Sequence, residues 1–257
     1  MRSLDDEKEQ GSRVRYAVVT GAGSGIGRAV AIALSQRFSV ALLGRDATRL
    51  AGTATQCDGQ ALQFPADVTD PAGVSAVFRT LREDWGRLDL LFNNAGTNVP
   101  TRPIDEHSAE ELHDVISSNL LGALYCSREA FAIMRTQQPT GGRIINNGSV
   151  AAYSPRPGSP AYTAAKHGMT GLTKSLILDG SPFGISCCQV DIGNAATART
   201  ERVESGVPQA DGTVRREPRL SLDVVVRHIV HLTKMPPESC VAFSTILPVG
   251  MPLFGRG

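Results

Sequence analysis

Short apolar runs alternate along the chain with longer segments of helical periodicity, and this alternation limits the possible folds more than any other feature. Apolar runs lie at 14–20, 39–43, 61–66, 88–92, 142–149 and 184–190, with a last one near 240–248. Helical segments lie at 25–36, 46–54, 70–85, 108–134 and 161–179, with one more near 221–234. The apolar runs do not alternate in polarity, so both faces of each strand are expected to be buried. The sequence therefore predicts a single α/β domain whose doubly wound parallel sheet has helices on both faces.

Length and composition agree with one domain and argue against several kinds of partner. The chain has 257 residues, 41% of them hydrophobic, and a formal net charge of +1. A net charge this close to zero does not favour nucleic acid or an acidic membrane surface as a partner. The five cysteines are scattered and lack the spacing of a zinc site or redox pair, which favours a reduced, cytoplasmic protein. We expect a small-molecule partner.

Two segments stand apart from the alternating pattern. Residues 1–13 are charged and lack an apolar core, which predicts a flexible leader, neither signal peptide nor membrane anchor, before a domain at 14–257. Residues 194–218 form a long stretch with glycines and charges, which predicts a lid over a site at the carboxyl ends of the strands. Its arginines at 199, 202, 215 and 216 alternate with glutamates at 201, 204 and 217, which is typical of a solvated mixed-charge surface.

A glycine-rich turn separates the first strand from the first helix. Gly21, Gly25 and Gly27 follow Thr20 with the spacing TGxxxGxG. Glycines let the backbone turn sharply and let a pyrophosphate approach the amide groups at a helix N-terminus. The turn therefore predicts a dinucleotide site, although such a turn alone can also be structural.

The residues after the next strands refine this prediction. Arg45 stands where an acidic residue would hold an unphosphorylated ribose, and an arginine can pair with a 2′-phosphate. This favours NADP(H) over NAD(H), with a solvated strand-end cation as the alternative. Asp67 is a candidate acceptor for the adenine amino group, and Asp46 and Asp70 are expected to cap helices. The stretch NNAG at 93–96 suits either a cofactor cleft or a turn.

Tyr162 and Lys166 are four residues apart on a predicted helix, so they share one face. A neighbouring ammonium favours the ionised form of a phenol, by on the order of 4 kcal/mol at about 4 Å and an effective dielectric near 20. Ser149 ends the strand before this helix, so its hydroxyl and that of Tyr162 could converge on one carbonyl oxygen. Asn119, on an apolar helical stretch, is expected to need a backbone carbonyl or a water as partner.

With these motifs in this order, the chain resembles the short-chain dehydrogenase/reductase family over residues 14 to about 197. The resemblance implies a Rossmann-like fold and a homodimer or homotetramer. It implies that Ser149 polarises a substrate carbonyl, Tyr162 moves the proton, Lys166 assists the tyrosine and holds the nicotinamide ribose, and Asn119 supports a water relay. The cofactor-binding residues it implies are Gly21, Ser24, Gly25, Ile26, Gly27, Arg45, Asp67, Val68, Asn94, Ala95, Gly96, Tyr162, Lys166, Ile192, Gly193 and Thr197. The substrate-binding residues would be Ser149, Tyr153 and Tyr162, with Tyr153 equally able to pack on the lid.

The chain also departs from the family pattern. Ile192 replaces a proline that most relatives carry before Gly193, and the C-terminal stretch lacks a frequent Asp-Gly-Gly. His228 and His231 share a helical face, but no third ligand suggests a metal site. The sequence thus predicts an NAD(P)(H)-dependent oxidoreductase that interconverts a carbonyl and a secondary alcohol. A 3-oxoacyl-carrier-protein reductase is the alternative, and a dinucleotide-sensing or scaffolding protein without activity is a more distant one.

Overall fold

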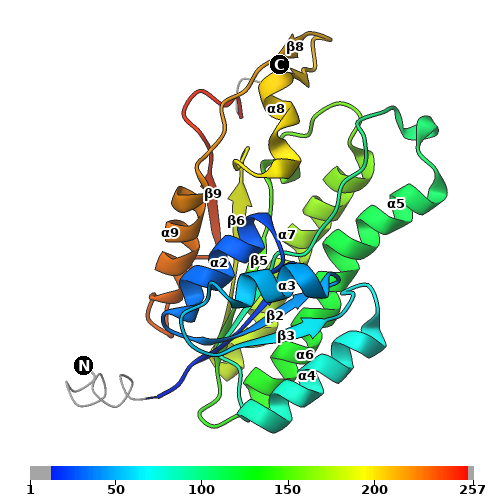
Figure 1. Ribbon diagram of the computed structural model, residues 1–257. Coiled ribbons are helices and arrows are strands. Elements are labelled where there is room, and N and C mark those ends of the chain that lie inside the picture. The colour runs from blue at the N-terminus through cyan, green and yellow to red at the C-terminus, as the bar shows by residue number, and fades with distance from the viewer. Residues whose placement is uncertain (1–12, 254–257) are drawn as a thin grey trace.

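A seven-stranded parallel sheet forms the centre of the molecule, in the order β3-β2-β1-β4-β5-β6-β9 (Figure 1). The computed structural model describes residues 13–253, with the backbone alone at 199, 202 and 204. The strands are β1 (Tyr16–Thr20), β2 (Ser39–Gly44), β3 (Ala61–Pro65), β4 (Leu90–Asn93), β5 (Gly142–Asn147), β6 (Ile185–Ile192) and β9 (Phe243–Ile246). The helices are α2 (Gly25–Ser35), α3 (Ala47–Ala54), α4 (Pro71–Trp85), α5 (Ala109–Ile116), α6 (Gly122–Thr136), α7 (Pro160–Gly180), α8 (Arg202–Ser205) and α9 (Leu222–Thr233). The predicted doubly wound parallel sheet is confirmed, and the predicted leader lies, apart from Arg13, outside the described residues.

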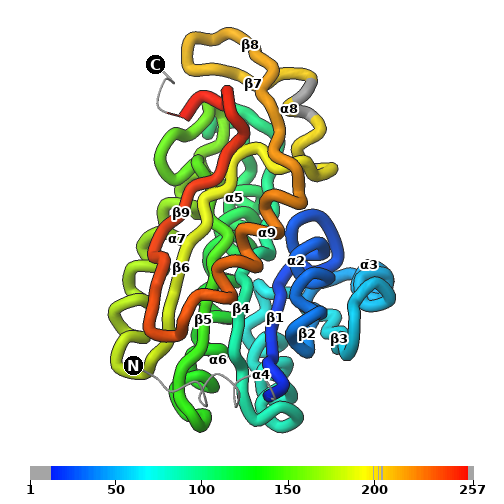
Figure 2. Tube along the Cα trace, turned by 90° about the vertical axis from the view of Figure 1, so that its left-hand side faces the viewer, coloured from blue at the N-terminus to red at the C-terminus, as the bar shows by residue number. Residues whose placement is uncertain are grey.

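Helices cover both faces of the sheet. In β1, Val18 packs toward one side and Ala17 and Val19 toward the other, and all three are fully buried. Helices α2, α3 and α9 pack on the side of Val19, and α4, α6 and α7 pack on the side of Val18. Figure 2 shows the strands side by side from β9 to β3. Because both faces are covered, the sheet can present polar groups to a ligand only at the ends of its strands.

Two aspartates begin helices as the sequence predicts. The Asp46 carboxylate accepts a hydrogen bond from the amide three residues further on, and the Asp70 carboxylate from the amide two residues further on, both at 3.0 Å. At the other end of α4, Gly86 has a φ of 67°, a conformation that ends a helix and favours glycine. These caps satisfy amides that the helix leaves free and fix where α3 and α4 begin. They thereby position the loops that carry Arg45 and Asp67.

The helix expected at 108–134 is present as one continuous helical segment, in which a π-helical turn at Ser117–Leu121 joins α5 to α6. Asn119 lies in this turn. Its Nδ2 donates to the carbonyl oxygens of Val115 and Thr97, both at 2.8 Å. A side chain that bonds into the backbone ladder in this way is a known cause of a local widening of a helix.

Residues 194–218, expected as a loop, contain regular structure. They include a 3₁₀ turn at Ala198–Thr200, the short helix α8, and an antiparallel pair formed by β7 (Val207–Pro208) and β8 (Val214–Arg215). In Figure 1 this segment lies at the top, beyond the carboxyl end of β6. The expectation of a solvated mixed-charge surface is wrong at Glu217, whose side chain is only 2% exposed. Its carboxylate turns inward because it finds hydrogen-bond donors there.

A buried arginine attaches the C-terminal part of the fold to the sheet. Arg143, at the start of β5, is 8% exposed. Its guanidinium donates to the carbonyl oxygen of Leu232 at the end of α9 and to those of Met235, Pro236 and Ser239 in the connection to β9. A guanidinium presents five donors in a fixed plane, so one side chain can satisfy several carbonyl groups. Among the described residues, no helix is long and apolar enough to cross a bilayer.

We expect Arg143→Met to destabilise the protein by about 2–4 kcal/mol, because four carbonyl groups lose their donor inside the structure. Denaturant unfolding followed by circular dichroism measures the change. Arg79→Met, at an exposed position of α4, is the matched control and should change the free energy of unfolding by less than about 0.5 kcal/mol. Equal effects of the two substitutions would contradict the anchoring role of Arg143.

Candidate active site

A cavity of about 530 Å³ opens at the carboxyl ends of the strands. It lies where the strand order reverses between β1 and β4, the point at which open parallel sheets bind ligands. Fifteen of the sixteen predicted cofactor-binding residues line it, and Gly27 is the exception. The lining also includes residues that sequence reasoning missed, namely Gly23, Gly44, Asp46, Arg49, Leu50, Ala66, Thr97, Ser118, Asn147, Gly148, Ala195, Ala198 and Thr200, together with the predicted catalytic residue Asn119.

The glycine-rich turn provides a cradle at the start of α2. Gly21 and Gly25 have φ values of 65° and 53°, which favour glycine. Gly27 lies beneath the turn, where a Cβ would overlap the carbonyl oxygen of Gly21. The first turn of α2 has no acidic residue, and Ser24 at its N-cap makes no side-chain capping bond. The amides at this helix start are therefore free to bind an anion.

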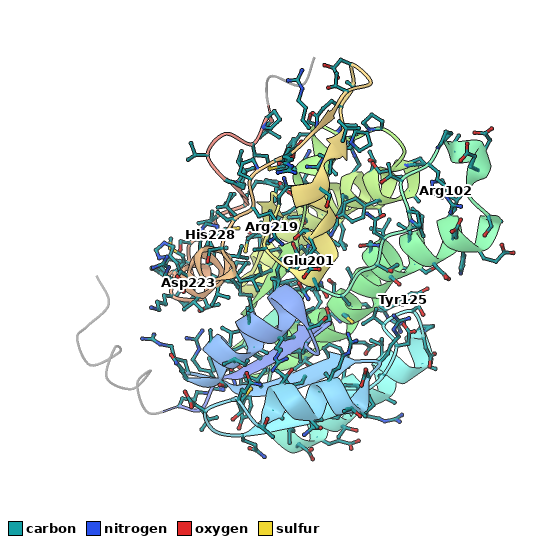
Figure 3. The ribbon with its side chains drawn as sticks, turned by 45° about the horizontal axis from the view of Figure 1, so that its top comes forward. Arg102, Tyr125, Glu201, Arg219, Asp223 and His228 are labelled. Carbon is teal, nitrogen blue, oxygen red and sulfur yellow. The ribbon has the colours of Figure 1, made fainter. Side chains whose placement is uncertain are left out.

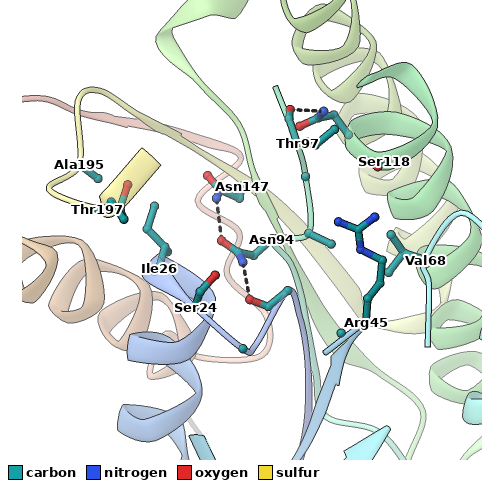
Figure 4. Close-up of a pocket in the computed structure, with 18 of the residues that line it drawn as sticks. Ser24, Ile26, Arg45, Val68, Asn94, Thr97, Ser118, Asn147, Ala195 and Thr197 are labelled. Carbon is teal, nitrogen blue, oxygen red and sulfur yellow. Dashed lines mark hydrogen bonds between the residues drawn. The ribbon is translucent and has the colours of Figure 1, made fainter. Parts of the chain in front are cut away.

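A chain of hydrogen bonds joins three strand ends around this cradle, and Figure 4 draws its link between Asn147 and Asn94. Thr20 Oγ1 accepts from the backbone amides of Asn94 and Ala95, both at 2.9 Å. The Asn94 amide group donates to the carbonyl oxygen of Thr20 at 3.0 Å, and Asn147 Nδ2 donates to Asn94 Oδ1 at 2.9 Å. The last three residues of the NNAG stretch, at 94–96, thus form part of the cavity wall. Asn147 was not predicted as a site residue, although its position at the end of a strand beside Ser149 was an available signal.

Arg45 and Arg49 form the end of the cavity nearest β2 and β3. The Arg45 guanidinium lies 3.8 Å from the Asp67 carboxylate, and its side chain is 76% exposed. Arg49, one helical turn further on, pairs with Asp46 at 3.2 Å, and its Cβ lies against Gly23 of the glycine-rich turn. Exposed pairs of this kind contribute little stability, so both arginines remain available to an anionic ligand. The sequence predicted one cation here, and the structure brings in a second.

Lys166 and Tyr162 lie together at the opposite end of the cavity. Lys166 is 6% exposed, and its Nζ donates to the carbonyl oxygen of Asn147 at 2.7 Å. The same Nζ lies 5.6 Å from the centre of the Tyr162 ring. Asn119 lines this cavity too, and a Cβ at Gly96 would overlap its Oδ1. Asn119 has the backbone partner that the sequence predicts, since its Nδ2 donates to the carbonyl oxygens of Thr97 and Val115.

A second cavity of about 370 Å³ contains Ser149 and meets the first one, since Tyr162, Ile192, Gly193 and Thr200 line both. Ser149 follows β5 and begins a 3₁₀ turn, where its Oγ accepts the amide of Ala151 at 3.1 Å. The serine hydroxyl proton is therefore free to donate elsewhere. The serine and the tyrosine, which the sequence predicted to converge, face one compartment.

A buried carboxylate supports Ser149 from behind. Asp191, near the end of β6, is fully buried and was not noticed in the sequence. Its Oδ1 accepts the backbone amide of Ser149 and the Gln189 amide group, both at 2.8 Å, and its Oδ2 accepts the Tyr153 hydroxyl at 2.7 Å. Gln189 in turn bonds Thr170 and Thr173 of α7, the helix of Tyr162. Asp191 thus connects the serine to the tyrosine helix.

The structure does not bring Tyr153 into the lining of the second cavity. Partial burial, the hydrogen bond to Asp191 and the charge of Asp191 raise the pKa of Tyr153 to about 12. The phenol therefore keeps its proton at neutral pH and continues to donate to Asp191. No physical feature of the sequence distinguished this role from a substrate contact.

The end of β6 explains the departure from the family pattern. Ile192 is a buried strand residue paired with Ile246 of β9, and the Gly193 amide donates to the Ile246 carbonyl at 2.8 Å. A Cβ at Gly193 would lie 2.8 Å from Met251 Sδ, so the C-terminal segment packs close to the site. Strand pairing thus supplies the stiffness that a proline would otherwise give.

The cavity fits a dinucleotide, because it offers uncapped amides at the start of α2, a glycine cradle beside them and two arginines at its far end. Among the described residues, no group of three His, Cys, Asp or Glu side chains is placed to hold a metal ion.

Comparisons with known proteins agree with this geometry. The chain is 36% identical to 3beta-hydroxysteroid dehydrogenase of Mediterraneibacter gnavus over 197 residues, which are 75% of this chain and 70% of that protein. It is 32% identical to 2-dehydro-3-deoxy-L-rhamnonate dehydrogenase (NAD(+)) of Sphingomonas sp. over 236 residues, 90% of this chain and 91% of that protein. The closed form of serine dehydrogenase complexed with NADP+ shares the fold, with a TM-score of 0.83 at 22% identity over 94% of this chain and 98% of that one. Because residues 15–207 match the short chain dehydrogenase family, the chain belongs to this family of oxidoreductases.

Proposed function

We propose that the protein is an NAD(P)(H)-dependent oxidoreductase that interconverts a carbonyl and a secondary alcohol. One observation carries the proposal: Ser149 and Tyr162 face one cavity, which meets the cavity of the glycine-rich cradle at Tyr162, Ile192 and Gly193. The bound nicotinamide supplies or accepts the hydride. The chain itself positions the substrate and handles the proton.

In the reduction direction, Tyr162 gives its hydroxyl proton to the substrate oxygen, and Ser149 donates a hydrogen bond to the same atom. These bonds strengthen as the oxygen gains negative charge, which lowers the barrier. Lys166 stabilises the tyrosinate that remains, because its ammonium is buried and held beside the ring. In oxidation the same groups act in reverse.

For the cofactor we propose NADP(H) ahead of NAD(H). Arg45 and Arg49 both line the far end of the dinucleotide cavity, and two guanidinium groups suit a 2′-phosphate. The named relatives include an enzyme designated for NAD(+) and a structure with NADP+, so family membership leaves this choice open.

The alternatives have less support. A 3-oxoacyl-carrier-protein reductase should have a basic entrance for its acidic carrier. Arg215 is paired with Asp211 at 3.1 Å, so the charge of this arginine is already balanced. The relatives reported above are named for other substrates. A scaffolding protein without activity should lack a catalytic residue, and all four are present. The lid role of 194–218, the homo-oligomeric state and the cytoplasmic location stay predictions.

We expect Tyr162→Phe to bind NADPH normally and to lose turnover by about 10²–10⁴-fold, because the proton donor is removed and the ring is kept. Cofactor fluorescence titration and steady-state reduction of a ketone panel measure the two effects. Tyr125→Phe on α6 (labelled in Figure 3) is the matched control, since Tyr125 lines neither cavity. Full turnover by Tyr162→Phe would rule out the proposed role.

We expect Arg45→Asp to weaken NADPH binding by about 10–100-fold and to spare NADH, because a charged hydrogen bond to the 2′-phosphate is lost. Titration with each cofactor gives the ratio of the two dissociation constants. Arg79→Asp makes the same charge change on α4 and should leave this ratio as it is in the native protein. A native protein that binds NADH more tightly would reverse the cofactor assignment.

We expect Asp191→Ala to lower kcat by about 10–100-fold with little change in the KM for the cofactor, because Ser149 loses the acceptor that holds its backbone. Asp191→Asn keeps one carbonyl oxygen as an acceptor and should have a smaller effect. Steady-state kinetics are read beside a thermal melt. Equal losses of kcat in Asp191→Asn and Asp191→Ala, or an increase in the KM for the cofactor alone, would argue against a role of Asp191 in positioning Ser149.

A further inference from the structure

The second cavity contains one feature that hydride and proton transfer do not use. Among the described residues that line it, Arg156 is the one charged side chain, and none carries a carboxylate. Arg156 lies in the connection between Ser149 and α7. Ser159 Oγ donates to the Arg156 carbonyl at 2.8 Å, which holds the connection in place. A cation is thus presented to the compartment in which the substrate carbonyl would be bound.

The guanidinium is fixed by one of its two terminal nitrogens. Arg156 Nη2 donates to Asn194 Oδ1 at 2.9 Å and to Glu217 Oε2. The other terminal nitrogen, Nη1, has no hydrogen-bond partner among the described residues and is not buried, whereas Nε is buried and also lacks a partner. The Arg156 side chain is 27% exposed. Nη1 is therefore an accessible donor whose orientation is already set by the protein.

Glu217 orients this arginine and stays out of the cavity. Its side chain is 2% exposed, and it also accepts Asn194 Nδ2 at 2.8 Å and Gln209 Nε2 at 3.1 Å. Burial alone would raise the pKa of Glu217, but the bonds from Asn194 and Gln209 and the charge of Arg156 outweigh it and lower the pKa. The exposed end of the pair is thus the cation, and the anion lies behind it.

We propose that the substrate of this protein is a small keto or hydroxy acid, and that Arg156 binds its carboxylate. The inference rests on the function proposed above and names the substrate class of that site. A preset guanidinium binds a carboxylate without further ordering, and the surrounding Val150, Pro157, Val203 and Val207 lower the local dielectric and strengthen the bond. A purely apolar substrate would displace water from Nη1 without offering a hydrogen-bond acceptor in its place, and this loss of a hydrogen bond costs free energy. A volume near 370 Å³ is at the lower end for ligand pockets and suits a short molecule.

Matched pairs of probes test the proposal. The probes are 2-oxobutanoate, 4-oxopentanoate and 5-oxohexanoate, each beside its primary amide, which has nearly the same shape without the charge. The readout is the ratio of kcat/KM for the acid to kcat/KM for the amide, with NADPH and with NADH. We expect a ratio above about 10 for at least one chain length in the native protein, as a charged hydrogen bond requires.

The main variant combines Arg156→Met with Glu217→Gln, so that no unpaired carboxylate is left buried. We expect its acid-to-amide ratio to fall by about 10–100-fold. Arg156→Lys keeps the charge but not the planar group, and should recover part of the ratio. The matched control combines Arg227→Met with Asp223→Asn, an exposed pair on α9 that lies 2.9 Å apart and lines neither cavity (Asp223 is labelled in Figure 3). It should leave the ratio unchanged.

Binding is measured beside turnover, so that the inference and the proposed function can fail separately. Each acid and amide is titrated into the protein with NADPH in the Tyr162→Phe background, where reduction should be slow, and the cofactor fluorescence reports formation of the ternary complex. Selective acid binding that the double variant loses supports the inference even if no probe is reduced. The absence of reduction would then count against the oxidoreductase function. Reduction of amides and acids with equal efficiency would keep the function and overturn the inference. A native ratio that the double variant retains would also overturn it.

Discussion

Asn147 is the residue on which the site depends, because its backbone carbonyl and its side-chain amide both make hydrogen bonds at the wall of the first cavity. Its carbonyl oxygen accepts the Lys166 ammonium, and its amide donates to Asn94, which bonds Thr20 in turn. The strand ends β1, β4 and β5 are thereby joined to α7. A parallel sheet offers polar backbone groups only where its strands end, so a ligand site there needs side chains that satisfy them first.

Buried charges extend the same principle beyond the strand ends. Asp191 and Glu217 are both withdrawn from solvent, and each is surrounded by donors from segments distant in the chain. Breaking such a cluster leaves an uncompensated charge, so each carboxylate fixes the geometry of its partners firmly. Asp191 fixes the serine loop, and Glu217 fixes the arginine that faces the second cavity. Two different carboxylates therefore fix two of the groups that line the second cavity.

Much of the fold was predictable because its signals are local. Burial of both strand faces produces apolar runs without alternation, and Asp46 and Asp70 cap their helices through bonds to neighbouring amides. The π-helical turn at Asn119 was not predictable, since Asn119 bonds the carbonyl of Thr97 in another segment. The structure within 194–218 was missed for a related reason. Its short elements have little periodicity of their own, and Glu217 turns inward only because Arg156 and Asn194 lie there.

The sequence by itself determined the parallel sheet, the glycine-rich turn and the pairing of Tyr162 with Lys166, because each is set by residues close together in the chain. The tertiary structure alone decided that Arg49 joins Arg45, that Tyr153 bonds Asp191 instead of lining the cavity, and that Arg156 Nη1 keeps no partner among the described residues. Each of these depends on which hydrogen-bond donors and acceptors meet across distant segments. A sequence pattern does not show which distant segments come into contact. Helical spacing and strand burial, in contrast, follow from the order of neighbouring residues.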